Sequence, residues 1–187
     1  MTLAECYRQG IEQLDEAGID SPSVDAFYLL EYVTGTDRVS YLMNKDSEVS
    51  DAAASEYFRV ISLRASHIPY QYITGEADFL GLKIEVTPDV LIPRLDTEVL
   101  FEEAEKLIPY GGRVLDMCTG SGCLACAVRY YRPDTFVTAS DISEAALDIA
   151  RHNEKRNPGS VCGHIRFVQS DLFEAFSEDD IFDVIIS

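Results

Sequence analysis

The sequence predicts an α/β protein in which a small helical bundle precedes a doubly wound parallel sheet. In residues 1–67 the apolar side chains recur at the three- and four-residue spacing of amphipathic helices. Residues 68–96 are rich in β-branched and aromatic residues punctuated by glycine and proline, which predicts a β-hairpin followed by an extended linker. In residues 97–187 short β-rich segments alternate with helical ones, the pattern of a parallel sheet packed against helices.

The helices expected in the first part carry their own start and stop signals. Thr2 and Glu5 have the spacing of a capping box, and Gly18 is placed to end that helix. The pair Ser21–Pro22 predicts a second start, with serine as the N-cap and proline at the first helical position. A third helix is expected over residues 51–66.

The α/β part is expected to contain alternating strands and helices. The expected strands are RVLDMC (113–118), FVTASD (136–141), IRFVQSD (165–171) and FDVIIS (182–187), and the expected helices cover residues 97–108, 122–131 and 143–156. This order predicts a doubly wound sheet, in which ligands bind at the carboxyl ends of the strands.

Charge and hydropathy exclude several classes of protein. The formal net charge is −18, from 33 acidic and 15 basic residues, so the surface repels phosphate backbones and direct nucleic-acid binding is not expected. The opening MTLAECYRQG lacks the apolar core of a signal peptide. No apolar run approaches the roughly 18 residues that span a bilayer. We therefore expect a cytoplasmic protein that does not enter a membrane.

The stretch VLDMCTGSGCLACAV (114–128) allows two interpretations. Cys118, Cys123 and Cys126 have the C-x4-C-x2-C spacing of plant-type ferredoxins, with Cys162 as a fourth ligand. That pattern, however, crosses a predicted strand, a glycine turn and an apolar helix, where a small thiol packs as a hydrophobe. We therefore expect no metal site. The chain has five cysteines, and an odd number in a cytoplasmic protein disfavours disulfides.

The glycines of the same stretch predict a nucleotide-binding loop. Residues 120–125 read GSGCLA, which fits G-x-G-x-x-A between a strand and a helix, and Asp141 follows about 20 residues later at the end of the next strand. Gly120 allows a tight turn, Gly122 lets the backbone approach a ligand, and Ala125 allows close packing of helix on sheet. Asp141 can accept hydrogen bonds from ribose hydroxyls. The loop alone does not choose between a nicotinamide dinucleotide and S-adenosylmethionine.

Two more aspartates are candidates at this edge of the sheet. Asp116 precedes the glycines and would either order the loop or meet the amino-acid end of a cofactor. Asp171, with Leu172 beside it, ends the third strand and is placed to meet an adenine edge. The alternative for Asp171 is the N-cap of a short following helix.

The longer motifs are IPYQYITGEADFLGLKIEV, VLIPRLDTE, VLDMCTGSG, ASDISEAALDIARHNEKRN, RFVQSDLFEAF and FDVIIS. Through them the whole chain resembles the class I S-adenosylmethionine-dependent methyltransferases, and more narrowly the release factor glutamine methyltransferases. The resemblance implies S-adenosylmethionine as cofactor. It also implies, as substrate, the side-chain amide of the glutamine in the Gly-Gly-Gln motif of a peptide chain release factor. The helical bundle would recognise that substrate, and we expect a monomer.

The resemblance also implies roles for individual residues. The implied cofactor-binding residues are Cys118, Thr119, Gly120, Ser121, Gly122, Asp141, Asp171 and Leu172, while Pro93, Arg94, Asp96, Thr97 and Asp116 would line the cofactor side of a cleft. Without the resemblance, Arg94 is an exposed linker charge and Asp96 a helix cap. The chain departs from the family at Cys118, where glycine is common, and at Leu95, where proline is common. Neither change removes a hydrogen-bonding side chain.

In the family, a strand like FDVIIS runs into Asn-Pro-Pro-Tyr, which positions the glutamine amide. The chain stops at Ser187, so we expect a sheet truncated after its fourth strand, with no catalytic residue of that motif and an open edge at FDVII. An amide nitrogen is a poor nucleophile, and catalysis of its methylation is largely positioning. The chain alone is therefore expected to transfer methyl groups poorly.

Three alternatives remain. A methyltransferase acting on a ribosomal-protein glutamine is the nearest, and the PRLDTE segment favours release factors over it. A domain binding a nicotinamide dinucleotide shares the glycine loop and Asp141, but leaves VLIPRLDTE and the helical bundle unexplained. A non-catalytic module that holds a partner through the helical bundle is the third.

Overall fold

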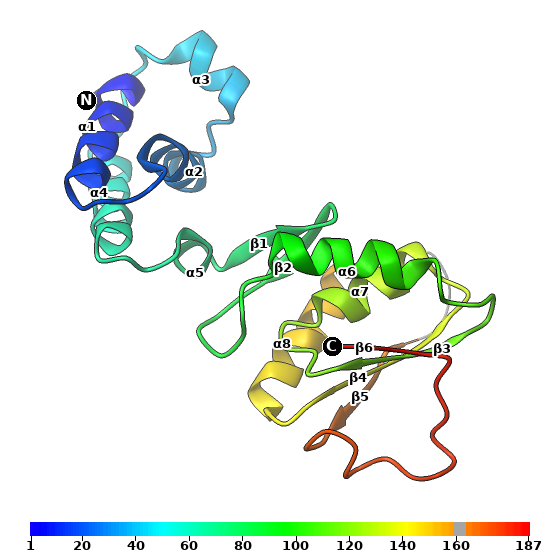
Figure 1. Ribbon diagram of the computed structural model, residues 1–187. Coiled ribbons are helices and arrows are strands. Elements are labelled where there is room, and N and C mark those ends of the chain that lie inside the picture. Colours follow the sequence, from blue (N-terminus) through cyan, green and yellow to red (C-terminus); the bar gives the residue numbers. More distant parts are fainter. Residues whose placement is uncertain (159–163) are drawn as a thin grey trace. The chain divides into compact units, whose positions relative to one another are not determined.

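The computed structural model describes residues 1–158 and 164–187. It divides into two compact units, Met1–Thr74 and Gly75–Ser187 (Figure 1). The division separates the helical part of the chain from the part that contains the strands. None of the helices in the described ranges is both long enough and apolar enough to cross a membrane.

The first unit is helical, as predicted. Its elements are α1 (Leu3–Glu16), α2 (Pro22–Thr34), α3 (Arg38–Asn44), α4 (Asp51–Ala65) and α5 (Tyr70–Thr74). Helices α1, α2 and α4 pack on one another around a core that includes Leu14, Leu29, Leu30 and Ile61. These residues come from the apolar stripes that the helical spacing predicted.

The capping box at the start of α1 is confirmed. The Thr2 hydroxyl accepts the Glu5 amide N–H at 3.2 Å, and the Glu5 carboxylate accepts the Thr2 amide N–H at 2.9 Å. Ser21 does occupy the N-cap position of α2, but its side chain makes no capping hydrogen bond. The helix begins there because Pro22 at its first position needs no partner for an amide N–H.

Two short helices differ from the sequence prediction. Helix α3 was not expected; Asp37 begins it by accepting the Ser40 amide N–H at 2.7 Å. Residues 70–74 form helix α5 and not the start of an extended hairpin. Its first turn begins where the Tyr72 amide N–H donates to the Pro69 carbonyl at 3.0 Å, and the Tyr70 ring stacks on that of Tyr28. Packing against α2 therefore overrides the β-propensity of these aromatic residues.

The second unit begins with the predicted hairpin. Strands β1 (Glu76–Phe79) and β2 (Leu82–Glu85) pair antiparallel. Leu80 and Gly81 form the two-residue turn and both have positive φ, +49° and +77°. Such a turn matches the twist of the strands it joins.

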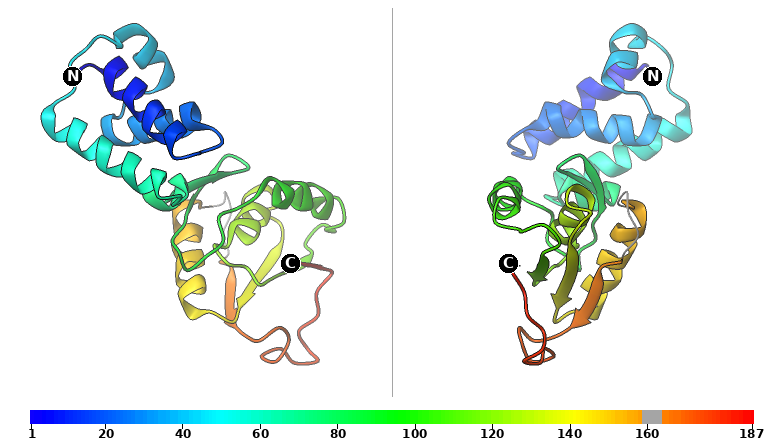
Figure 2. Two further views of the ribbon diagram at one scale, coloured as in Figure 1. Left: turned by 60° about the vertical axis from the view of Figure 1, so that its left-hand side comes forward. Right: turned by 90° about the vertical axis from the view of Figure 1, so that its right-hand side faces the viewer.

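The predicted parallel sheet follows. Its strands are β3 (Arg113–Met117), β4 (Phe136–Asp141), β5 (Arg166–Gln169) and β6 (Val184–Ile186), and its helices are α6 (Leu95–Glu105), α7 (Cys123–Tyr131) and α8 (Glu144–Arg156). Within the described residues the strand order is β5-β4-β3-β6, all parallel. The chain moves outward from β3 to β5 and then returns to place β6 on the other side of β3 (Figures 1 and 2). This reversal confirms the doubly wound fold.

Helix α7 occupies the centre of this unit. It packs against α6, α8, β3 and β4, and Cys123–Arg129 are all buried. Burial on every side explains why LACAV is apolar throughout instead of amphipathic. Helix α6 begins at Leu95, two residues before the predicted start, and ends at Glu105, three residues before the predicted end.

Candidate functional site

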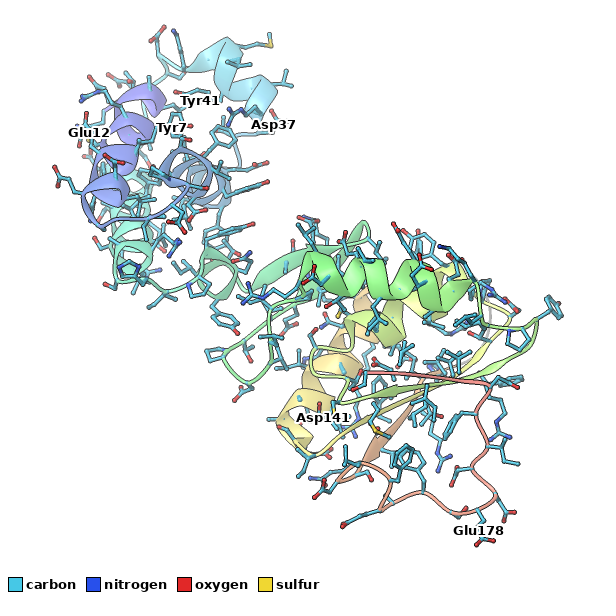
Figure 3. The ribbon with its side chains drawn as sticks, viewed as in Figure 1. Tyr7, Glu12, Asp37, Tyr41, Asp141 and Glu178 are labelled. Carbon is cyan, nitrogen blue, oxygen red and sulfur yellow. The ribbon has the colours of Figure 1, made fainter. Side chains whose placement is uncertain are left out.

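The carboxyl ends of β3, β4 and β5 meet at one edge of the sheet. The strand order reverses between β3 and its neighbours, which is where doubly wound sheets bind ligands. The glycine loop follows β3, Asp141 is the last residue of β4, and Asp171 follows β5. The structure therefore brings together the residues that the sequence placed at strand ends. Figure 3 labels Asp141 close to the start of α8.

Asp141 connects two segments of this edge. One carboxylate oxygen accepts the Gly120 amide N–H at 2.9 Å, and the other accepts the Ser143 amide N–H at 2.9 Å. Each carboxylate oxygen has two lone-pair sites, so each can accept one more hydrogen bond. The side chain is partly exposed. Asp141 can therefore hold the loop and accept two hydroxyl groups, such as those of a ribose, at the same time.

Asp116 anchors the loop from inside. Its side chain is only 1% exposed and accepts the Thr119 hydroxyl at 2.5 Å and the Ala125 amide N–H at 3.0 Å. The amide N–H of Thr119 donates in turn to the Ser140 carbonyl at 2.9 Å. Burial raises the pKa of Asp116 to about 7. These contacts support the loop-ordering role for Asp116, because both of them hold residues of the loop or of the first turn of α7.

The two glycines have different surroundings. Gly120 has φ +55°, and a Cβ added there would meet nothing within 4 Å. Gly122 has φ +77°, and a Cβ there would lie 2.7 Å from the Cβ of Ala150 in α8. The close contact with α8 therefore explains why residue 122 is glycine, whereas the sequence suggested the approach of a ligand. Gly120 is the glycine that leaves open space beside the loop. Cys118, which is exposed, has φ +59°, a conformation that favours glycine.

Asp171 lines a hollow next to Asp141. The Ser170 amide N–H donates to the Asp141 carbonyl at 3.0 Å. The hollow, of about 400 Å³, is lined by Ile142, Gln169, Ser170, Asp171, Glu174 and Ala175. Leu172 does not line it and is exposed, with φ +47°. Residues 172–175 form a turn, so the prediction of Asp171 as a helix cap was wrong.

The segment from Pro93 to Thr97 lies at the start of α6. Arg94 occupies the N-cap position without a side-chain capping bond, and Asp96 lies within the first turn, so the interpretation of Asp96 as the cap was wrong. The Thr97 amide N–H donates to the Arg94 carbonyl at 3.0 Å. In the described ranges, no hydrogen bond or ion pair joins this segment to the glycine loop or to Asp141. The placing of Pro93, Arg94, Asp96 and Thr97 on the cofactor side of a cleft therefore stays a prediction.

The cysteines do not form a ligand set in the part of the chain that is described. Cys118 is exposed, whereas Cys123 and Cys126 are buried in α7. Burial raises the pKa of the Cys123 thiol to about 12, and the thiolate is the form that binds metals. No group of three or more histidine, cysteine or acidic residues in residues 1–158 and 164–187 could hold a metal ion. Cys162, the suggested fourth ligand, lies outside the described residues.

One residue of the site was missed in the sequence. Asn153 in α8 is fully buried, and its amide nitrogen donates to the Ser121 carbonyl of the loop at 2.9 Å. It continues the buried face formed by Ala146, Ile149 and Ala150. A polar residue in an apolar helical stripe was the signal that could have identified it, because a buried amide requires partners.

A second hollow lies at the opposite edge of the same sheet. It has a volume of about 550 Å³, and its lining includes Arg113, Phe136 and Arg166, the first residues of β3, β4 and β5. Arg166 is already paired with Asp180 at 2.5 Å. This hollow is larger than the one beside Asp141 but lies away from the carboxyl ends of the strands, where this fold binds ligands.

Comparisons with known proteins give matches for both units. The PrmC N-terminal domain matches residues 5–75, and the methyltransferase small domain matches residues 89–187. The release factor glutamine methyltransferase of Moorella thermoacetica is 37% identical over 158 residues, which is 83% of this chain and 56% of that protein. The protein of the same name from Burkholderia pseudomallei is 37% identical over 169 residues, 88% of this chain and 59% of the relative.

A third relative covers the chain from end to end. The release factor glutamine methyltransferase of Koribacter versatilis is 37% identical over 189 residues, which is 100% of this chain and 66% of that protein. The resemblance seen in the motifs is therefore confirmed. The chain spans 56% to 66% of the length of these three curated relatives.

Proposed function

Since the chain belongs to the methyltransferase small domain family, we propose that its second unit binds S-adenosylmethionine at the carboxyl edge of the parallel sheet. We further propose that the protein is a methyltransferase whose substrate is a glutamine side-chain amide in a peptide chain release factor. The names of the relatives similar over both units support this substrate. The alternative, a ribosomal-protein glutamine, has the same acceptor group and is separated by experiment below.

The position of Asp141 is the observation that carries the proposal. Its carboxylate holds the Gly120 amide N–H and keeps lone pairs for two ribose hydroxyls. The space beside Gly120 has no atom within 4 Å of an added Cβ, which allows a ligand to approach the backbone. The hollow lined by Ile142 and Asp171 adjoins Asp141 and suits the adenine. The residues present therefore fit an adenosine-containing cofactor.

Bound S-adenosylmethionine supplies an electrophilic methyl group on a sulfonium. Transfer to a glutamine forms an N–C bond while the C–S bond breaks, leaves S-adenosylhomocysteine, and releases one amide proton. The contribution of the described residues is positioning: Asp141 orients the ribose, and Asp116 with Thr119 fixes the loop. Positioning is a large part of catalysis for a weak nucleophile.

We also propose that the first unit recognises the protein substrate and that the protein acts in the cytoplasm as a monomer. The net charge of −18 supports a protein partner over nucleic acid. Co-elution of this chain with a release factor in size-exclusion chromatography, with light scattering to give the mass, tests both partner and monomer. Binding of a ribosomal protein but not the release factor would favour the alternative substrate. Binding of neither would remove the substrate proposal.

The cofactor is tested by calorimetric titration with S-adenosylhomocysteine and, separately, with NAD. We expect saturable binding of S-adenosylhomocysteine that is lost in Asp141→Ala. The matched control is Asp148→Ala, which removes an exposed carboxylate paired with Arg151 on the same helix and should bind normally. Saturable binding of NAD without binding of S-adenosylhomocysteine would refute the proposal.

A further inference from the structure

Asn153 uses its whole side-chain amide to join two segments. The nitrogen donates to the Ser121 carbonyl at 2.9 Å and to the Glu85 carbonyl at 3.0 Å. The oxygen accepts the Glu85 amide N–H at 2.6 Å. Both N–H donors and the oxygen of the Asn153 amide are thus hydrogen-bonded, to the glycine loop and to β2 of the hairpin. These segments are more than thirty positions apart in the chain, and Asn153 contacts both.

The chemistry of the position requires an amide. A carboxylate at Asn153 would place acceptors opposite the carbonyls of Ser121 and Glu85, and an aliphatic side chain would leave all three backbone groups without their partner. Each buried polar group left without a partner is costly. Among the twenty side chains, only asparagine and the longer glutamine combine two amide donors with one acceptor.

A second contact fixes the same loop to the same helix. Ala150, one turn before Asn153 in α8, lies against Gly122 so closely that an added Cβ would clash at 2.7 Å. Ser121 and Gly122 therefore both rest on α8. The side-chain amide that binds the Ser121 carbonyl also binds the backbone of Glu85.

We infer that Asn153 is a positioning residue that couples occupancy of the cofactor loop to the hairpin strand β2. A nucleoside that orders the loop strengthens the bond to Ser121, which holds the Asn153 amide in the rotamer that Glu85 needs. By reciprocity, breaking the bonds between Asn153 and Glu85 weakens cofactor binding. This inference rests on the proposed function, because it requires that the loop binds S-adenosylmethionine.

The coupling is measured first on the unaltered chain. Hydrogen exchange of the Glu85 amide N–H, followed by NMR, is compared with and without saturating S-adenosylhomocysteine. We expect exchange at Glu85 to slow by about tenfold, the size of a typical coupling between sites. Binding that leaves exchange at Glu85 unchanged would overturn the inference but not the proposed function. No binding by the unaltered chain would refute both.

Two variants, one in α8 and one at its C-cap, separate coupling from simple loss of stability. Asn153→Ser removes the amide and leaves room for a water, and we expect it to weaken S-adenosylhomocysteine by about tenfold and to abolish the slowing at Glu85. Asn157→Leu is the matched control. The Asn157 amide donates to the Lys83 carbonyl of β2 at 2.9 Å and to the Asn153 carbonyl, but not to the loop.

Asn157→Leu should therefore keep both the affinity and the slowing at Glu85. A purely structural role for Asn153 predicts that both variants lower stability while affinity and coupling persist, and that result would overturn the inference. If Asn153→Ser does not fold, the exchange measurement on the unaltered chain decides alone.

Discussion

Replacing Gly122 by alanine is expected to destabilise the second unit much more than the same change at Gly120. Both glycines have positive φ, +77° and +55°, so both variants bear the cost of a left-handed alanine, about 1–2 kcal/mol. At Gly122 the new methyl group would also lie 2.7 Å from the Cβ of Ala150 and 3.0 Å from the Cα of the same residue. Overpacking of this kind costs about 1–3 kcal/mol more.

The expected losses in free energy of unfolding are therefore about 2–5 kcal/mol for Gly122→Ala and about 1–2 kcal/mol for Gly120→Ala. Urea unfolding followed through the NMR signals of β3 measures the second unit without interference from the first. The partner variant Ala150→Gly removes the methyl group that the new side chain would meet and leaves the backbone of α8 in place. It should therefore restore part, but not all, of the stability lost in Gly122→Ala.

Binding should show the opposite order. Gly120→Ala fills the open space beside the loop, so it is expected to weaken the binding of S-adenosylhomocysteine more than Gly122→Ala does, although it destabilises the fold less. An equal loss of stability in the two variants would refute the claim that residue 122 must be glycine because it lies against α8. Normal binding by Gly120→Ala would refute the approach of the cofactor at Gly120.

Two further predictions concern buried charges. Burial raises the pKa of Asp116 to about 7 from its ordinary value of 3.8, so the stability that its protonated form contributes is present below about pH 4 and is lost as the pH rises to about 7. Asp116→Asn should lack this loss when the free energy of unfolding in urea is measured at each pH. Parallel plots of that free energy against pH for the variant and the unaltered chain would contradict the prediction. Arg64 and Asp25 form an ion pair at 2.6 Å, and their side chains are only 17% and 9% exposed. Arg64→Ala leaves the Asp25 carboxylate without this partner, so it should lower the free energy of unfolding of the first unit, measured by thermal unfolding, by about 2–4 kcal/mol. Arg59→Ala, which breaks the exposed pair with Glu56, should leave the midpoint of thermal unfolding nearly unchanged, and equal losses in the two variants would contradict the role of burial.

Local signals in the sequence were sufficient for most of the secondary structure. The Thr2–Glu5 capping box specifies its hydrogen bonds within a few residues, so the start of α1 could be predicted. The alternation of strands and helices from residue 113 to residue 169 predicted the parallel sheet, because strands joined through a helix return to the sheet in parallel. Asp141 followed from its spacing after the glycines.

Features that depend on distant contacts could not be predicted in the same way. Helix α5 forms where Tyr70 stacks on Tyr28, forty-two positions earlier in the sequence, and the local composition favoured a strand. The reason for Gly122 lies in Ala150, and the role of Asn153 lies in Ser121 and Glu85. The roles of Gly122 and Asn153 both depend on the packing of α8 against the loop, which the local sequence pattern does not encode.

The most direct test of the central claim is an NMR titration of the 187-residue chain with S-adenosylhomocysteine. If the cofactor binds at the carboxyl edge of the sheet, the amide signals of Gly120, Gly122, Ile142 and Asp171 should shift and saturate together, while those of Arg113 and Arg166 at the opposite edge should not. Shifts confined to Arg113, Phe136 and Arg166 would place the ligand in the hollow at the amino ends of the strands and would contradict the account.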